Sequence, residues 1–209
     1  MTKGILLVIS APSGGGKTTL ASGLLEKVPP LSYSVSVTTR SPRAGEKEGV
    51  DYYYVTEEEF KKKKDAGELL EYAFVHGFWY GTPRDFIEEK LHAGEDVLLD
   101  IDVQGGSQIK KNSPEAVLVF IIPPSMEALE QRLRRRQKDD ETTIQRRLKR
   151  AKQEMEESSN YDYLILNDKI DQALDRLYSI YGAEKLRMGR ARSKILAVLN
   201  ESKKELKNG

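Results

Sequence analysis

Short apolar runs, each followed by a segment of helical pattern, recur along the chain. Residues 5–9 form a continuous aliphatic run of strand length, which is typical of a strand buried on both faces. Residues 18–27 follow with helical periodicity, and Pro29 and Pro30 predict where that helix ends. Three more strand and helix pairs are predicted, at 97–101 with 105–111, 117–122 with 125–136, and 163–166 with 170–188. This repetition predicts an α/β fold in which helices cover both faces of a parallel sheet.

The segment from residue 31 to about residue 94 interrupts that repetition. It contains the alternating stretch YSVSV, the tyrosine-rich stretch DYYYV and several glycine turns, which together predict a small mixed α+β insertion. Within it, EEEFKKKKDAGE indicates a charged helix that turns Phe60 inward. We therefore expect a core formed by residues 1–32 and 95–190, with a separate lobe at 33–94.

Composition narrows the range of functions. The chain has 34 basic and 33 acidic side chains and a formal charge of +1, so no overall field draws it to nucleic acid or to a membrane. It has no cysteine, which excludes disulfides, thiolate nucleophiles and cysteine zinc sites. The starting stretch MTKGILLVIS is too short for a membrane span and has no cleavage-like site after it. We expect a cytoplasmic protein that acts on small molecules.

A glycine-rich loop, SAPSGGGKTT, lies between the first predicted strand and its helix. Backbone N–H groups ahead of a helix N-terminus bind phosphate, because unpaired donors and the helix dipole converge on one anion. Lys17 is placed to reach the outer phosphates, and Thr18 offers a hydroxyl to magnesium. Ala11 replaces the usual first glycine, and alanine fits there if φ is negative. The loop predicts a nucleoside triphosphate site made of Ser13, Gly14, Gly15, Gly16, Lys17, Thr18 and Thr19.

Two acids and two arginines are further candidates. Asp100 and Asp102 end the strand stretch VLLDID, at the carboxyl end where ligands of α/β sheets gather, and magnesium needs few protein oxygens beside phosphate and water. The alternative for either acid is capping of the next helix. Arg40 and Arg43 flank Pro42, and guanidinium groups bind phosphate with two hydrogen bonds each. A solvated surface pair is the alternative for these arginines.

Seven stretches carry a resemblance to guanylate kinases: SAPSGGGKTT, SVTTRSPRAGE, DYYYV, LLEYAFVHGFWYGT, LDIDVQG, RLRRRQ and YLILND. They occur in the order and approximate spacing of that family, from Gly4 to about Met188, and the family's loop often begins with alanine. The resemblance implies a P-loop NTPase-type parallel sheet, a GMP-binding insertion and a helical lid at about 132–152. It also implies ATP-dependent phosphorylation of GMP, and of dGMP, with Mg²⁺ as cofactor.

The resemblance also implies roles for individual residues. Glu71 faces the guanine base; its carboxylate can accept from the two adjacent donors of guanine, whereas adenine shows one donor beside one acceptor. Hydroxyls of Ser36 and Thr82 are expected to donate to the guanine carbonyl. The remaining implied assignments are Arg40, Arg43, Tyr52 and Tyr80 for the GMP phosphate, Asp102 for the base, Asn167 near adenine, Lys17, Arg132, Arg136 and Arg147 for the transferred phosphoryl group, and Thr18 and Asp100 for magnesium.

The chain also departs from the family pattern. Arg135 and Gln137 stand where many relatives have glycine, so which lid arginine contacts adenine stays open. A solvated, salt-bridge-laced helical face is the favoured alternative for the other arginines of this region. Those arginines are Arg134, Arg135, Arg146 and Arg150. A simple turn is the alternative for Asn167. Residues 190–209 lie beyond the resemblance and predict an amphipathic helix, so that both a monomer and a homo-oligomer remain possible.

Two other functions compete with the one implied. Guanylate-kinase-like domains of scaffold proteins bind peptides and characteristically lack a functional loop, whereas Lys17 and Thr18 are present here. A nucleoside-monophosphate kinase for another base gains little from a carboxylate that faces the base, so Glu71 favours guanine.

Overall fold

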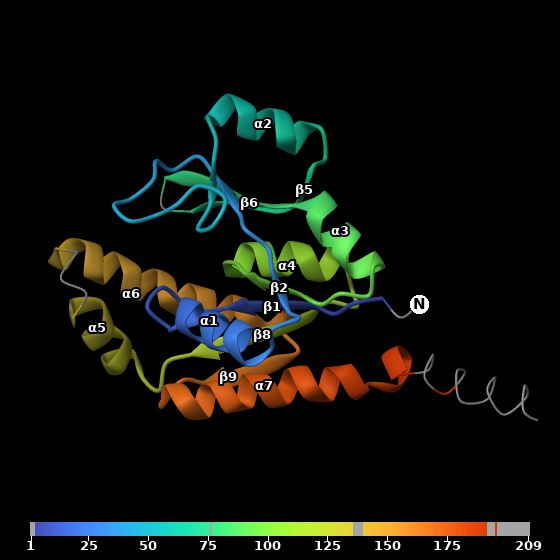
Figure 1. Ribbon diagram of the computed structural model, residues 1–209. Coiled ribbons are helices and arrows are strands. Elements are labelled where there is room, and N and C mark those ends of the chain that lie inside the picture. The colour runs from blue at the N-terminus through green and yellow to red at the C-terminus, as the bar shows by residue number, and fades with distance from the viewer. Residues whose placement is uncertain (1–2, 76, 136–139, 192–194, 196–209) are drawn as a thin grey trace, which may run out of the picture.

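The computed structural model describes residues 3–75, 77–135, 140–191 and 195. Its core is a five-stranded sheet of order β2-β7-β1-β8-β9, in which every neighbouring pair is parallel. A second, four-stranded sheet lies in a small lobe above the core (Figure 1). The core strands are β1 (Leu6–Ser10), β2 (Ser32–Tyr33), β7 (Val97–Asp100), β8 (Val117–Ile122) and β9 (Tyr163–Leu166).

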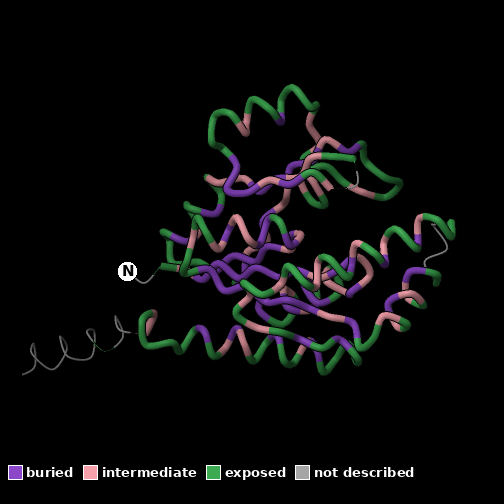
Figure 2. The backbone as a smooth tube through the Cα atoms, turned by 180° about the vertical axis from the view of Figure 1, so that it is seen from behind, coloured by how far each residue is buried: buried purple, intermediate pink, exposed green. Residues whose placement is uncertain are grey.

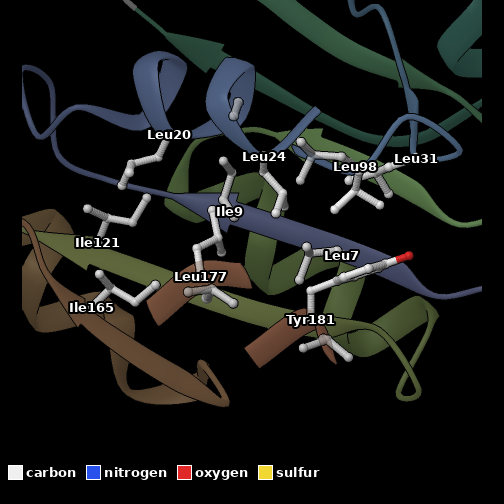
Figure 3. Packing of buried hydrophobic residues seen from close by; sticks show 14 of the residues in the cluster. Leu7, Ile9, Leu20, Leu24, Leu31, Leu98, Ile121, Ile165, Leu177 and Tyr181 are labelled. Atoms are coloured by element: carbon white, nitrogen blue, oxygen red, sulfur yellow. The ribbon is translucent and has the colours of Figure 1, made fainter. Parts of the chain in front are cut away.

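Helices cover both faces of the core sheet, as the sequence predicts. Leu7 and Ile9 pack with buried residues of α1 (Lys17–Lys27) and α7 (Ile170–Leu186) on one face (Figure 3). The alternate residues Leu6 and Val8 pack with α3 (Arg84–His92) and α4 (Val103–Asn112) on the other face. Figure 2 shows the resulting concentration of buried residues along the central strands. Each fully buried aliphatic side chain contributes roughly 1.5–3 kcal/mol relative to exposure.

Most predicted elements are confirmed, with shifted ends. Residues 117–122 and 163–166 are strands as predicted. Helix α4 begins earlier than predicted, at Val103, because the Asp102 side chain caps it by accepting from the Gly105 amide at 2.9 Å. Helix α7 ends at Leu186, before the predicted end, because Arg187 has extended backbone angles.

The small lobe has the mixed composition that the sequence predicts. Its sheet order is β4-β3-β6-β5, and α2 (Glu57–Asp65) begins with a capping box between Thr56 and Glu59. Phe60 is 2 % exposed and stacks on Trp79 at 5.7 Å between ring centroids, so its predicted inward orientation is confirmed. The lobe strands are β3 (Val37–Thr38), β4 (Tyr53–Tyr54), β5 (Leu69–Val75) and β6 (Phe78–Pro83).

Parts of residues 33–94 pack with the core. Tyr33 belongs to β2, which pairs with β7 in the core sheet. Helix α3 turns Ile87 and Leu91 into the core cluster below the lobe. Both ends of the insertion therefore belong to the core: the chain leaves the core after β2 and returns to it at α3.

A helical hairpin extends to one side of the sheet (Figure 1). It consists of α5 (Met126–Arg135) and α6 (Glu141–Glu156), followed by a short 3₁₀ helix, η1 (Glu157–Asn160). Leu129 and Leu133 of α5 pack with Ile144 and Leu148 of α6 in a cluster of their own. Arg136 lies outside the described residues. No helix in the described ranges is long and apolar enough to cross a membrane.

A buried carboxylate fastens α7 to the amino ends of the core strands. Asp96 is 5 % exposed, and its Oδ1 accepts from the Ile5 amide at 2.7 Å. Its Oδ2 accepts from the Tyr181 hydroxyl and the Lys185 ammonium, each at 2.6 Å. This carboxylate therefore satisfies a buried backbone donor and two side chains of α7 at once.

We predict that Asp96→Ala lowers the free energy of unfolding by about 3 kcal/mol, because it leaves buried donors without a charged acceptor. Urea denaturation followed by circular dichroism measures this change. Asp175→Ala is the matched control, because among the described residues the Asp175 carboxylate makes only an exposed ion pair with Lys27, and its loss should cost less than about 1 kcal/mol. Equal losses in the two variants would contradict this role of Asp96.

Candidate functional site

The loop after β1 has the geometry of a phosphate cradle. Gly14 and Gly16 have φ values of 91° and 97°, a region that side chains disfavour, so glycine is required at both positions. Gly16 is the N-cap of α1 and places no side-chain acceptor on the first helical amides. Ala11 packs against the core cluster, which explains why a methyl group is accepted at this position. The free amides at the start of α1 can therefore bind an anion.

Asn167 and Arg132 stabilise the conformation of this loop. The Asn167 side-chain amide, on a residue that is 3 % exposed, donates to the Gly15 carbonyl at 2.8 Å. Arg132 of α5 donates from Nη2 to the Asn167 carbonyl at 2.7 Å. The sequence suggested an adenine contact or a simple turn for Asn167, and its buried contact with the loop was not anticipated. The pattern holds no signal for this contact, because it joins residues from opposite ends of the chain.

Lys17 and Asp100 meet at the carboxyl ends of β1 and β7. The Lys17 ammonium donates to the Asp100 carbonyl at 2.8 Å. The Asp100 carboxylate accepts from the Tyr33 hydroxyl at 2.6 Å. Burial and the Asp100 charge raise the pKa of Tyr33 well above its ordinary value, so Tyr33 remains a donor. The capping alternative applies to Asp102 and not to Asp100.

A cavity of about 170 Å³ lies between the loop, the end of β7 and the small lobe. It joins residues that are distant in the sequence, and it includes most of those expected to hold GMP. The lining residues are Lys17, Ser36, Tyr52, Glu71, Ala73, Val75, Tyr80, Asp100, Ile101 and Asp102. The predicted acceptor site and the predicted triphosphate loop thus open onto one space, with Lys17 in common.

Glu71 is the least compensated buried charge of this cavity. Its side chain lies on β5, the residue is 4 % exposed, and Oε1 accepts from the Thr82 hydroxyl at 2.6 Å. Burial raises the pKa of Glu71 to about 7, partly opposed by the Thr82 bond, and the Asp102 charge adds to the rise. Strand pairing places Thr82 opposite Glu71, so that its hydroxyl donates to this carboxylate; the expected bond from Thr82 to guanine stays a prediction.

Asp102 has two functions in this structure. Its Oδ1 caps α4, while its Oδ2 lies 3.7 Å from the guanidinium of Arg150. Arg150 also donates to Glu154, four residues along α6, at 2.7 Å, an ion pair of the kind that the salt-bridged helical face describes. Arg134 likewise pairs with Glu130 and Glu141, on an exposed face.

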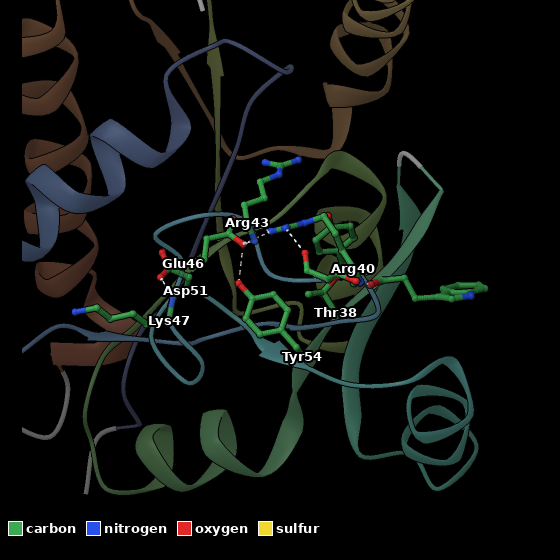
Figure 4. A network of polar contacts seen from close by, with 10 residues as sticks. Thr38, Arg40, Arg43, Glu46, Lys47, Asp51 and Tyr54 are labelled. Carbon is green, nitrogen blue, oxygen red and sulfur yellow. Dashed lines mark hydrogen bonds and ion pairs between the residues drawn. The ribbon is translucent and has the colours of Figure 1, made fainter. Parts of the chain in front are cut away.

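The two arginines expected at the acceptor phosphate differ sharply (Figure 4). Arg40 is 7 % exposed, and its guanidinium donates to the Glu46 carboxylate, the Ser41 carbonyl and the Tyr80 hydroxyl. Arg43 is exposed, and its side chain extends away from Glu46. Most donors of Arg40 already have partners, whereas the side chain of Arg43 is exposed, and the binding of phosphate by both arginines stays a prediction.

Tyrosine rings complete the acceptor side. Tyr52 meets the Tyr80 ring edge-on at 5.8 Å and lies 5.3 Å from the Arg40 guanidinium. Burial, followed by the Asp100 charge, raises the pKa of Tyr52 to about 12, so its hydroxyl is protonated at neutral pH and can donate. Arg147 lies half-buried on α6 and does not line this cavity.

Comparisons with known proteins identify the relatives of this chain. The family described as "Guanylate kinase" matches residues 3–184. A guanylate kinase of Synechococcus sp. (strain JA-3-3Ab) is 49 % identical over 86 % of this chain and 82 % of its own length. One of Caldanaerobacter subterraneus subsp. tengcongensis is 43 % identical over 96 % of this chain and 97 % of its own. The crystal structure of guanylate kinase from Anaplasma phagocytophilum is 40 % identical, with a TM-score of 0.76 over 91 % of this chain and 90 % of that one.

We predict that Gly105→Ala destabilises the protein by about 1–3 kcal/mol, although alanine is the better helix former. A Cβ at Gly105 would clash with Glu71 Oε2 and would force the carboxyl group to move. Gly182→Ala in α7 is the control, because a Cβ there meets nothing within 4 Å. Thermal unfolding should show a gain of up to about 1 kcal/mol for the control. A similar gain for Gly105→Ala would refute the close contact.

Proposed function

This chain belongs to the guanylate kinase family, and we propose that its reaction takes place in the cavity between core and lobe: it transfers the γ-phosphoryl group of ATP to GMP and forms ADP and GDP. The observation that carries the proposal is the shared cavity, in which Lys17 of the phosphate loop and Glu71 of the lobe line one space. We include dGMP as a second substrate, as the family resemblance implies.

Glu71 selects the base. Its carboxylate is held by Thr82 at one oxygen and lies over Gly105 at the other, so its position is fixed before the base arrives. The ring N–H and the amino group of guanine give this carboxylate the donors that the buried site lacks. A base with an acceptor at either position would leave the charge unpaired, which is a large penalty in a buried site.

The phosphate of GMP lies at the other end of the cavity. Arg43 contributes the two-bond fork, because its guanidinium is exposed and extends away from Glu46. Tyr52 and Tyr80 contribute neutral donors. Arg40 adds positive charge and those of its N–H groups that do not already donate to Glu46, Ser41 or Tyr80. The acceptor phosphate oxygen is already anionic at neutral pH, so the reaction needs no general base.

The phosphates of ATP bind the amides of residues 13–19, and the Lys17 ammonium moves from the Asp100 carbonyl to the outer phosphates. Lys17 then stabilises the charge of the group in flight, together with Arg147 and Arg136 of the lid region. Arg132 acts indirectly: it donates to the Asn167 carbonyl, and the Asn167 side chain stabilises the conformation of the loop. Catalysis therefore consists of positioning and charge stabilisation.

We propose Mg²⁺ as the metal, held by Thr18 and, through water, by Asp100. These oxygen ligands suit Mg²⁺. The Thr18 side chain is exposed, and the Tyr33 hydroxyl binds Oδ1 of Asp100 and not Oδ2. The described residues contain no cluster of three or more His, Cys, Asp or Glu, which suits an ion that relies on substrate phosphates. When bound, Mg²⁺ neutralises charge on the β- and γ-phosphates.

The peptide-binding alternative is disfavoured, because the loop retains Lys17 and glycines with the φ values that a cradle requires. We place the enzyme in the cytoplasm. We propose that residues 1–32 and 95–190 bind ATP and that the lobe within 33–94 binds GMP.

We predict that an assay of ADP release shows turnover with GMP and dGMP and none above background with AMP, CMP or UMP. The reason is the single carboxylate at the base, which pairs only with adjacent donors. Lys17→Met supplies the background, since it removes the cation at the transferred group and should abolish turnover. Turnover with AMP that equals turnover with GMP would contradict the proposed base selection.

We predict opposite effects of Glu71→Gln on stability and on GMP binding. Folding raises the Glu71 pKa to about 7, so ionisation of Glu71 destabilises the folded state. This destabilisation grows as the pH rises from the pKa of Glu71 in the unfolded chain toward 7. Without nucleotide, Glu71→Gln should be more stable than the wild type at pH 8 by on the order of 2–3 kcal/mol, and equal to it near pH 4. Thermal unfolding at several pH values measures this.

The same variant should bind GMP about a hundredfold more weakly at pH 8, with the KM for ATP unchanged. In the wild type the KM for GMP should fall between pH 6 and pH 8, as Glu71 ionises, and in Glu71→Gln it should be flat. An unchanged GMP affinity in the variant would show that Glu71 does not face the base.

A further inference from the structure

Glu46 is the centre of the polar network on the acceptor side (Figure 4). Its two oxygens accept from Arg40 Nη2 at 2.8 and 2.9 Å. One of these oxygens also accepts from the Arg43 backbone amide at 2.8 Å and from the Tyr54 hydroxyl at 2.7 Å. The carboxylate thus joins the segment after β3, the loop that carries Arg43, and strand β4.

This carboxylate compensates a buried cation. The side chain of Arg40 is 8 % exposed and that of Glu46 is 18 % exposed. The hydrogen bond from Arg40 lowers the pKa of Glu46 to about 2, ahead of the opposing effect of burial. Glu46 therefore stays ionised at every pH at which the enzyme is assayed, and the Arg40–Glu46 pair adds little net charge to the acceptor site.

The partners of Arg40 leave few of its donors for a ligand. Nε donates to the Tyr80 hydroxyl at 3.3 Å and Nη1 donates to the Ser41 carbonyl at 2.7 Å, in addition to the bonds from Nη2 to Glu46. Arg43 has a different situation: its backbone is held by Glu46, and its guanidinium is exposed. The main charged fork for a phosphate therefore belongs to Arg43, and Glu46 fixes the backbone from which it projects.

We infer that Glu46 is a positioning residue for the acceptor phosphate, which it orients by fixing the Arg43 backbone and holding Arg40 in place. This inference rests on the proposed function, since it assigns a role at the GMP phosphate. It also excludes the opposite role, in which Glu46 competes with the phosphate for Arg40 and weakens GMP binding.

The test compares Glu46→Gln with Asp51→Asn. Asp51 is a matched control from the same loop: its carboxylate accepts from the Lys47 amide at 2.8 Å, as Glu46 accepts from the Arg43 amide, but it has no arginine among its hydrogen-bond partners in the described residues. Calorimetry measures the binding of GMP and of guanosine, which lacks the phosphate. Glu46→Gln should weaken GMP binding by about tenfold to a hundredfold, leave guanosine binding and the KM for ATP unchanged, and exceed the effect of Asp51→Asn.

A double variant tests whether Glu46 acts through Arg43. In an Arg43→Met background, adding Glu46→Gln should cause a smaller further loss of GMP affinity than it causes in the wild type, because the fork that Glu46 positions is gone. If Glu46→Gln does not fold, Tyr54→Phe takes its place: it removes one bond to the carboxylate and keeps the charge pair, and it should weaken GMP binding by about twofold to fivefold while guanosine binding is unchanged.

The outcomes separate the inference from the proposed function. A wild type that binds GMP no better than guanosine would overturn the proposed function itself. A wild type that prefers GMP, with GMP binding unchanged or tighter in Glu46→Gln, would overturn the inference alone. Unchanged binding in Tyr54→Phe would do the same if that variant is the one used.

Discussion

The site depends on the parallel pairing of β1 with β7. Ile9 lies opposite Asp100 in this register, so the phosphate loop that follows β1 and the acids that follow β7 leave the sheet at one edge. The bond from Lys17 to the Asp100 carbonyl joins the two. Helix α4, which begins at this edge, packs against β5 of the lobe and thereby carries Glu71 to the same space. A shift in this pairing would separate the triphosphate loop from the acceptor site.

Asp96, Arg40 and Glu71 are buried charges that differ in how fully they are compensated. Asp96, far from the site, has three donors, and Arg40 has the Glu46 carboxylate. Glu71 has one hydroxyl, and burial keeps its pKa high. In the proposed function, guanine offers the two donors that this carboxylate lacks. Stability is thus sacrificed at the position where binding restores it, as is common at functional sites.

The sequence predicts the core well because its strands are continuous aliphatic runs and its helices have clear periodicity and caps. It also indicates the loop, since Gly14, Gly16 and Lys17 are close in the chain and their local geometry suffices. The sequence does not indicate which hydrogen-bond donors already have an acceptor within the protein. The partners of Thr82 and Asn167 lie on other elements, and only tertiary packing shows that their hydrogen bonds are committed. The ion pair of Arg150 with Asp102 likewise joins separate elements. Glu46 is within the recognised stretch SVTTRSPRAGE, yet its role appears only when β4 brings Tyr54 beside it.

The proposed reaction requires that the loop amides and Arg43 hold two phosphates that face each other. A crystal structure with GMP and an ATP analogue that cannot transfer its γ-phosphoryl group would show whether they do. We expect guanine on Glu71, the GMP phosphate on Arg43, and one of its oxygens in line with the γ-phosphorus held by Lys17. A structure with both nucleotides bound and their phosphates on separate surfaces would contradict the proposed reaction.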